Sequence, residues 1–453
     1  MDSIKRGFLQ LGMEIPLCLY MLTSYLKYPV FQNLIYEKLC LQRYNDLTFC
    51  SNISAYYDDK ELQTQASHFY SISSYTLILP SLFSTLILGV ASDYWSVKVP
   101  LLIPFFGLVL NTVNYVIQSS LVHANVYLLL ISDAIFGVCG GYISIISMTM
   151  SYGVKTTRRM RRSYRIAGME GAIGLGGTIG YALSGTIREA LGYAYAFVLM
   201  LILQLIAFFY ILLIARESER SPEEEPMNVE LGTKLRLVFF YFFQMLTTQR
   251  PTRLYIFLNL FALGLELLIF SGLGDIQYSY LRYKLAWGDK QYGWFSGLSF
   301  GLTTIAVLTL YPFLRFRGFS DGQLGCIGMM TKIVSLLMMA FVINPAMAYS
   351  IAAVTMLNRF VSSGFRSFLS SLIATEEQGK MFSLIALLEG VTSLLATAIY
   401  NNVYPVTLHF FPGFLYVLSA LLLLPSIVIL GYSDFVLKRL TAEEPVDHGT
   451  TDE

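Results

Sequence analysis

The chain has 453 residues, of which 55% are hydrophobic and 13% are charged, and its formal net charge is +1. So apolar a composition excludes a soluble globular protein and indicates a membrane protein.

Twelve apolar runs approach or exceed the roughly 20 residues that a helix needs to cross the bilayer. They lie near 12–30, 69–91, 99–118, 124–150, 165–187, 192–214, 254–275, 292–314, 323–344, 347–373, 380–400 and 411–433. The first run contains Glu14 and Lys27 and has no small-residue cleavage site after a clean apolar core. We therefore expect no cleavable signal peptide, and the first helix acts as its own insertion signal.

The Lys and Arg residues gather on the side of the membrane that holds both termini, so we expect both termini in the cytoplasm. The largest group lies between the fourth and fifth runs and comprises Lys155, Arg158, Arg159, Arg161 and Arg162. Because this basic loop joins two spanning segments, we interpret it as a topology anchor and expect no nucleic acid as a partner.

The long first loop, at about 31–68, is expected on the external side. It contains the glycosylation sequon "NIS", which begins at Asn52. Cys40 and Cys50 lie in the same loop, where an oxidising compartment permits a disulfide between them. Two unpaired thiols remain the alternative.

The fifth run contains one acid, Glu170, in the sequence "GMEGAIGLGGTIGYALSG". Small residues recur there every four positions and form a ridge for close helix packing, namely Gly168, Ala172, Gly176, Gly180 and Ser184. Glu170 points away from that ridge, toward Gly174 and Gly177, whose missing side chains are expected to leave room for water or solute. A carboxyl in hydrocarbon favours its protonated form and can carry a proton, although a structural carboxyl bonded to a neighbouring helix is the alternative.

The polar segment "ARESERSPEEEPMNVELGTKLR" divides the runs into six and six. We place an N-terminal bundle at 1–214, a cytoplasmic linker at 215–253, a C-terminal bundle at 254–433 and a cytoplasmic tail at 434–453. Six helices, a cytoplasmic loop and six more helices resemble the plan of the major facilitator superfamily, in which two bundles rock about a central site. The fold class expected is therefore an all-α membrane protein with two six-helix bundles.

Two short motifs are similar to the cytoplasmic gating signature of that superfamily. In "GVASDYWSVK", Gly89 is followed four residues later by Asp93, which could accept hydrogen bonds from the N-terminus of a neighbouring helix. Its counterpart "RFRGFSDG" places Asp321 after basic residues between helices eight and nine. We therefore assign Gly89, Asp93 and Asp321 to gating.

Helix ten carries two arginines, Arg359 and Arg366, which are seven residues apart and share one face. Arginine stays charged when buried, so both must face the bundle interior or a wet cavity. One guanidinium can hold a carboxylate or phosphate of the solute in a bidentate manner. For Arg359, an ion pair with an acid on another helix is an equal alternative.

Other charges also fall within the apolar runs. We assign Lys27 and Glu389 to the solute cavity and Glu266 to proton coupling, as a second titrating group. Asp275 and Lys332 are expected close to helix ends.

About 50 residues in the last third resemble the family of the proton-coupled folate transporter and its haem-carrier and lysosomal relatives. They are "EEQGKMFSLIALLEG" and "IYNNVYPVTLHFFPGFLYVLSALLLLP", and the first helix and "YRIAGMEG" resemble that family as well. The resemblance implies a proton-driven carrier of bulky, often anionic organic solutes. It also implies that Glu170 takes part in proton coupling and that Arg366 belongs to the substrate site. Helix seven lacks the histidine of the folate carrier, which puts folate itself in doubt.

The function expected is a proton-coupled symporter that imports a folate-like, muropeptide or cyclic dinucleotide solute by alternating access. A transporter-like receptor or scaffold and a membrane-embedded enzyme are the alternatives. We find no HExxH, CxxC or P-loop motif, so we expect no catalytic residue, metal or cofactor. The expected partners are the solute, protons and the bilayer, in a monomer of the plasma membrane, with the endolysosomal membrane as the other location.

Overall fold

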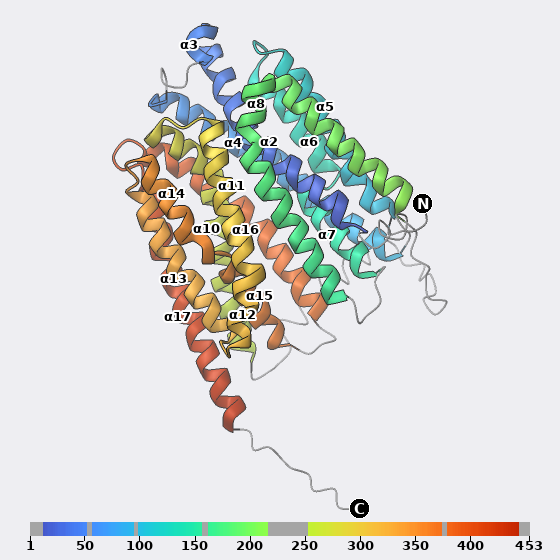
Figure 1. Ribbon diagram of the computed structural model, residues 1–453, viewed down its shortest axis with the longest axis vertical. Coiled ribbons are helices and arrows are strands. Elements are labelled where there is room, and N and C mark those ends of the chain that lie inside the picture. Colours follow the sequence, from blue (N-terminus) through green and yellow to red (C-terminus); the bar gives the residue numbers. More distant parts are fainter. Residues whose placement is uncertain are drawn as a thin grey trace, which may run out of the picture.

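The computed structural model describes residues 12–51, 57–94, 98–155, 162–215, 252–373 and 378–443. Throughout these ranges the chain forms helices and short connectors, without a β-strand (Figure 1). Asn52 and nearly all of the predicted linker 215–253 lie outside the described residues.

The N-terminal bundle contains six membrane crossings. Its elements are α2 (Glu14–Tyr44), the short α3 (Leu47–Ser51), α4 (Lys60–Tyr94), α5 (Lys98–Ser120), the 3-10 helix η2 (Val126–Leu129), α6 (Leu130–Val138), α7 (Gly141–Lys155) and α8 (Arg162–Ile214). The fourth crossing consists of η2, α6 and α7. The fifth and sixth crossings are the two halves of α8, which Gly192 separates with a non-helical φ of 77°.

The C-terminal bundle contains the other six crossings. Its elements are α10 (Arg253–Leu285), α11 (Asp289–Ile305), the π-helical η4 (Ala306–Leu310), α12 (Tyr311–Phe316), α13 (Asp321–Ala340), α14 (Pro345–Val354), the 3-10 helix η5 (Thr355–Leu357), α15 (Arg359–Ser371), α16 (Gln378–Thr407) and α17 (Phe414–Glu443). The predicted arrangement of twelve helices in two bundles is therefore confirmed.

Eight described segments are long and apolar enough to cross a membrane by length and composition. One of them, Gly168–Ile214, has 47 residues and would be about 70 Å long as one helix, roughly twice the bilayer core. With the break at Gly192 it accounts for two crossings. The remaining three crossings are α2, the segment from α14 to α15, and α16, which pack beside the other helices of their bundles.

We call the side of the bundles that holds residues 14, 214, 253 and 443 the inner side, and the opposite side the outer side. Both described ends of the chain lie on the inner side. The sequence predicts that this inner side is cytoplasmic.

Two predicted boundaries are wrong. The first helix continues to Tyr44 instead of ending near residue 30, so the connection to α4 is much shorter than 31–68. Polar side chains permit this because they find partners: the Lys38 ammonium is 0% exposed and donates to the carbonyl oxygens of Leu121 and Ala124 beyond α5. Helix α17 likewise continues to Glu443, into the predicted tail.

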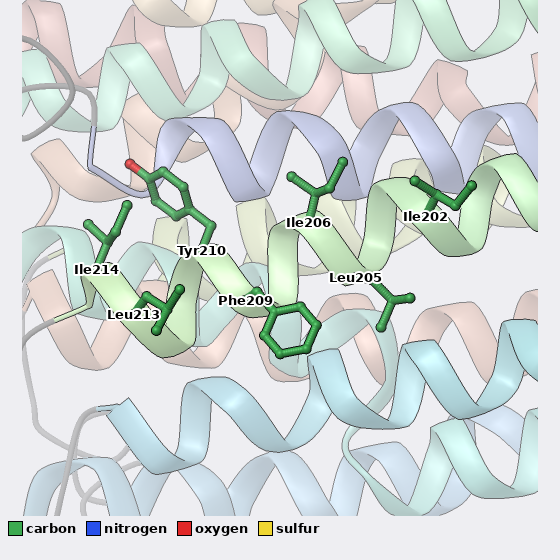
Figure 2. A pocket seen from close by; sticks show the side chains of 7 residues that line it. All are labelled: Ile202, Leu205, Ile206, Phe209, Tyr210, Leu213 and Ile214. Atoms are coloured by element: carbon green, nitrogen blue, oxygen red, sulfur yellow. The ribbon is translucent and has the colours of Figure 1, made fainter. Parts of the chain in front are cut away.

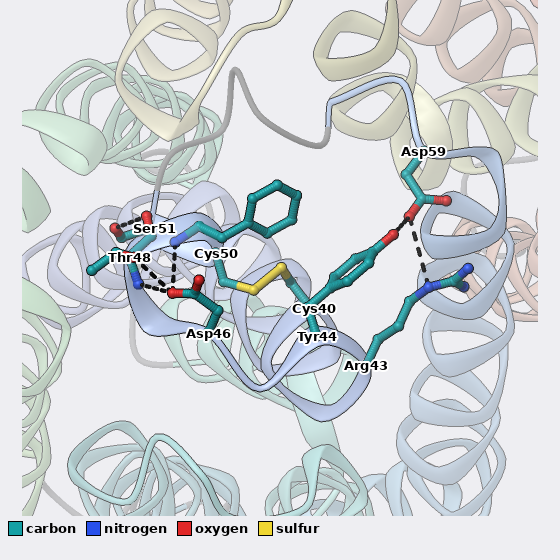
Figure 3. Close-up of a disulfide and its surroundings, with 9 residues drawn as sticks. Cys40, Arg43, Tyr44, Asp46, Thr48, Cys50, Ser51 and Asp59 are labelled. Atoms are coloured by element: carbon teal, nitrogen blue, oxygen red, sulfur yellow. Dashed lines mark hydrogen bonds and ion pairs between the residues drawn. A yellow bond between two sulfur atoms is a disulfide. The ribbon is translucent and has the colours of Figure 1, made fainter.

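A disulfide closes the outer end of α2. Cys40 lies on α2 and Cys50 on α3, with their Cα atoms 5.6 Å apart and both side chains buried (Figure 3). Asp46 directly precedes α3, and hydrogen bonds from the Thr48 hydroxyl and from the Phe49 N–H to its carboxylate lower the pKa of Asp46. The disulfide and this cap together fold the chain back over the end of the helix.

The small-residue ridge of α8 packs on α2. At Gly176 an added Cβ would lie 2.5 Å from the carbonyl oxygen of Cys18, and at Gly180 it would meet the carbonyl oxygen of Leu22. Backbone can approach backbone this closely only where no side chain intervenes. The ridge thus fixes the first half of α8 against the first helix.

We predict that Gly176→Ala destabilises the protein, because the new methyl group would collide with the α2 backbone at a cost of about 1–3 kcal/mol. Gly171→Ala is the matched control on the same helix, since its Cβ would meet nothing within 4 Å. The free energy of unfolding of the control should rise by up to about 1 kcal/mol, because alanine has a higher helix propensity than glycine. Thermal unfolding of both purified variants measures the difference, and equal melting temperatures would contradict the packing described.

Candidate functional site

The outer ends of the two bundles are joined by a partly buried ion pair. Arg188 of α8 donates from Nε and Nη2 to the two carboxylate oxygens of Asp289 on α11, at 2.7 and 2.6 Å. The Asp289 side chain is fully buried, and Glu189 forms a second ion pair with Lys290 beside it. A bidentate ion pair of this kind holds two helices in one register.

A second set of outer contacts joins α2 to α10. The Tyr278 hydroxyl donates to Asn33 at 3.1 Å, the hydroxyl oxygens of Tyr36 and Ser279 are 2.8 Å apart, and Tyr28 donates to the Gly274 carbonyl oxygen. Together with the Arg188–Asp289 ion pair, these bonds close the outer side. In Figure 1, α8 and α11 lie side by side at the top and separate toward the bottom.

The face of α8 opposite the ridge contacts α11 of the other bundle. Gly177 receives the Phe300 ring, and Gly174 receives the Thr304 side chain. The expectation that these glycines leave room for water or solute is therefore wrong. The missing side chains instead let the two bundles touch at mid-membrane.

Glu170 lies on this same face, one turn closer to the inner side than Gly174. Its side chain is exposed, and it forms no hydrogen bond or ion pair with another described residue. It lies within electrostatic range of Tyr25 on α2 and of Arg359 on α15. The predicted proton carrier thus lies one turn inward of Gly174, which contacts Thr304 of α11.

The structure gives the two arginines of helix ten different partners. Arg359 stacks on Phe300, with its guanidinium carbon 4.3 Å from the ring centroid. Arg366 instead forms an ion pair with Glu389 on α16 at 3.1 Å, and the two side chains are 37% and 50% exposed. We call Glu170, Tyr25, Arg359, Arg366 and Glu389 the central cluster.

Lys27 and Glu266 lie apart from the contacts of the central cluster. The Lys27 ammonium lies 5.2 Å from the centroid of the Tyr115 ring, in electrostatic range of Asp133. Glu266 accepts a hydrogen bond from Lys332 at 2.7 Å, and both side chains are buried.

Asp275 and Lys332 are interior residues of α10 and α13, so placing them close to helix ends was wrong. Helix α10 extends ten residues beyond the predicted end of its apolar run, because Tyr278, Tyr280 and Arg282 pack inside the protein. Lys332 tolerates the interior through its ion pair with Glu266. Asp275 does so by accepting hydrogen bonds from Thr397 and Asn401.

The residues assigned to gating lie near the inner ends of helices. Asp321 accepts hydrogen bonds from Tyr311 and Ser367 and pairs with Arg315 at 3.0 Å, all within its own bundle. Gly89 lies near the end of α4, where its Cβ would approach Met148. The side chain of Asp93 lies outside the described part of the chain.

A surface hollow lies on the second half of α8, and no charged side chain lines it. Its lining is almost entirely apolar, as Figure 2 shows. The residues are Ile202, Leu205, Ile206, Phe209, Tyr210, Leu213 and Ile214. Within the ranges that the structure describes, no three His, Cys, Asp or Glu residues are placed to hold a metal ion.

Sequence reasoning missed the outer ion pair and the aromatic partners of Arg359. Arg188 and Asp289 stand at helix ends, where charges are common and carry no distinguishing pattern. Tyr25 and Phe300 could have been suspected, because Phe300 follows a Gly-rich stretch of α11 that resembles the packing face of α8. Only the fold shows that the two faces meet.

Comparison with known proteins gives a consistent picture. A model described as the Major Facilitator Superfamily matches residues 43–397. The proton-coupled folate transporter of Rattus norvegicus is 27% identical, over 84% of this chain and 82% of that protein. The lysosomal proton-coupled steroid conjugate and bile acid symporter SLC46A3 of Mus musculus is 26% identical, over 86% of each chain.

Solved structures show the same fold at lower identity. The human organic anion transporter MFSD10 superimposes with a TM-score of 0.67 at 14% identity, covering 94% of this chain and 99% of that one. An auto-inhibited peptide transporter of the POT family gives a TM-score of 0.65 at 15% identity, covering 94% and 96%.

We predict that Lys332→Met lowers stability by about 3–5 kcal/mol, because it leaves the Glu266 carboxylate buried without a counter-ion. The double variant Glu266→Gln with Lys332→Met should recover most of the loss. Glu61→Gln is the control: Glu61 pairs with Arg43 at the surface, where an ion pair is worth about 0–1 kcal/mol. Thermal unfolding of the three variants measures these changes. An unchanged melting temperature of Lys332→Met would contradict a structural role for the pair.

Proposed function

This chain belongs to the major facilitator superfamily, and from that premise we propose that it is a proton-coupled symporter of a bulky organic anion. Relatives named as proton-coupled carriers of folate and of steroid conjugates and bile acids support the proposal. The observation that carries it is the central cluster, in which the exposed acid Glu170 of a spanning helix lies within electrostatic range of Tyr25 and Arg359, and Arg366 pairs with Glu389.

The arrangement of the bundles suits alternating access. Contacts between α8 and α11 and between α2 and α10 close the outer side, while the central cluster lies inward of them. A solute bound at the cluster would therefore be shielded from the outer solution and released toward the inner side. The opposite tilt of the bundles would break the outer bonds and expose the cluster outward.

Glu170 is the proposed proton carrier. It lies in a spanning helix and faces the other bundle, so its charge changes the attraction between the bundles. Protonation makes it neutral and removes the cost of a bare carboxylate at this depth. Arg366 is the proposed contact for the anion, with Glu389 as the partner that holds its guanidinium when no solute is bound.

We predict that Glu170→Gln abolishes concentrative uptake into proteoliposomes but preserves solute exchange, because the variant mimics the protonated state permanently. Wild-type uptake of labelled folate or a labelled bile acid should rise as the outer solution is acidified from about pH 7.5 to about pH 5.5, since protonation is the loading step. Uptake without pH dependence, or concentrative uptake by Glu170→Gln, would refute the mechanism.

We predict that Arg366→Ala weakens binding of the anionic probe by at least about tenfold, which corresponds to losing about 1.4 kcal/mol. Arg366→Lys should restore only part of the affinity, because an ammonium cannot make the planar two-pronged contact. Arg43→Ala, at the outer surface beside Glu61, is the control and should bind normally. Equal affinities of Arg366→Ala and wild type would exclude Arg366 from the solute site.

A further inference from the structure

One side of α16 carries a row of polar residues, which we call the polar row. It consists of Glu389, Ser393, Thr397 and Asn401, which follow one another at intervals of four residues, so that each adjoins the next along the helix. From its first member to its last the helix rises by about 18 Å. The Glu389 side chain at the inner end is 50% exposed, whereas Thr397 and Asn401 at the outer end are buried. The polar row thus leads from the central cluster toward the closed outer side.

Asp275 of α10 meets the outer end of the polar row. Its Oδ2 atom accepts hydrogen bonds from the Thr397 hydroxyl at 2.7 Å and from the Asn401 side-chain amide at 3.2 Å. Its Oδ1 atom accepts none from any residue that the structure describes, and no lysine or arginine among those residues pairs with it. The Oδ1 atom of Asn401 is buried and likewise accepts no hydrogen bond within the described ranges. Two acceptor oxygens of adjoining side chains therefore lack a donor, which is rare for buried polar groups.

A glycine opens space beside Asp275. Gly274 is exposed, and a Cβ atom added to it would meet nothing within 4 Å. The carbonyl oxygen of Gly274 accepts a hydrogen bond from the Tyr28 hydroxyl of α2, so this space faces the N-terminal bundle. Tyr142 of α7, in that bundle, lies within electrostatic range of both Asp275 and Glu389. The two ends of the polar row therefore open toward the same wall of the N-terminal bundle.

The two ends of the polar row need ligand groups of opposite charge. At the inner end, Arg366 offers a guanidinium, which forms an ion pair with Glu389. At the outer end, the partners of the Asp275 carboxylate are a hydroxyl and an amide, which bear no charge to balance it. A cationic donor stabilises a carboxylate at this depth, because charge-assisted hydrogen bonds are strong and an unpaired charge in the membrane is costly. A ligand with an ammonium, amidinium or guanidinium group would meet this need.

We propose that Asp275 and Asn401 bind a cationic donor group of the solute, a primary amine, amidine or guanidine, while Arg366 binds its carboxylate. This inference rests on the proposed function and narrows the solute class from a bulky organic anion to an elongated zwitterion. Its charged groups should be about 12 Å apart, since eight positions of α16 separate Glu389 from Thr397. An ammonium donates three hydrogen bonds, so one such group can satisfy both unpaired oxygens at the outer end.

The test measures binding and needs no transport. Purified protein in nanodiscs is titrated with ω-amino carboxylates, from aminohexanoate to aminododecanoate. The matched series consists of alkyl carboxylates of the same lengths, in which a methyl group replaces the ammonium. A ligand that binds the folded state raises the melting temperature, so thermal unfolding over a range of ligand concentrations gives each affinity.

We expect one intermediate chain length of the amino carboxylates to bind the wild type at least about tenfold more tightly than its methyl counterpart. Asp275→Asn can still accept the bonds from Thr397 and Asn401 through its amide oxygen, but it offers the ligand a donor, so this preference should disappear. Asp133→Asn is the matched control and should keep the preference. Asp133 is also buried and accepts hydrogen bonds from two hydroxyl groups, but it lies in the N-terminal bundle, apart from the polar row.

Asp275→Glu extends the carboxylate by one methylene and should shift the preferred ligand to a shorter chain, which tests the site if Asp275→Asn does not fold. Three results would overturn the proposal: equal affinities of the wild type for the two series, a preference that persists in Asp275→Asn, or a preference lost in Asp133→Asn. Failure of the proposed function is separate, because it would appear as uptake without proton dependence while the preference for amines persisted.

Discussion

The structure depends on how closely the first half of α8 approaches its neighbours on two faces. Glycines on one face let it touch the backbone of α2, and glycines on the other let it touch α11 across the bundle boundary. Without Cβ atoms on both faces, the helix can be held by its own bundle and still contact the other one. The position of Glu170 follows, because it ends the row of contacts with α11.

The membrane then decides what each charge can do. Glu266 with Lys332, and Arg188 with Asp289, are charges that meet a partner at hydrogen-bond distance; the first pair is buried, and in the second Asp289 is buried. Pairs of this kind specify the register of helices more than they add stability. Glu170 is different because it stays exposed and lacks such a partner among the described residues.

Much of the fold could be predicted from the sequence, because apolar length and the four-residue spacing of small residues are local properties. The twelve helices and the packing ridge with Gly176 are of this kind. The ion pairs could not be predicted, since Lys332 and Glu266 are 66 positions apart and meet only in the folded bundle. The prediction that the first helix ends near residue 30 failed for the same reason. A lysine such as Lys38 indicates a loop in the sequence, and its carbonyl partners are brought to it only by the fold.

The candidate site shows the same division between local and distant information. Glu170 and Arg366 could be proposed from single motifs, but the difference between Arg359 and Arg366 could not, because both share one helix face. The two arginines separate only through their neighbours: Arg359 stacks on Phe300 of α11, whereas Arg366 forms an ion pair with Glu389 of α16. One helix face thus carries two cations in different surroundings, an aromatic ring and a carboxylate, and these partners come from helices that only the tertiary fold brings to α15.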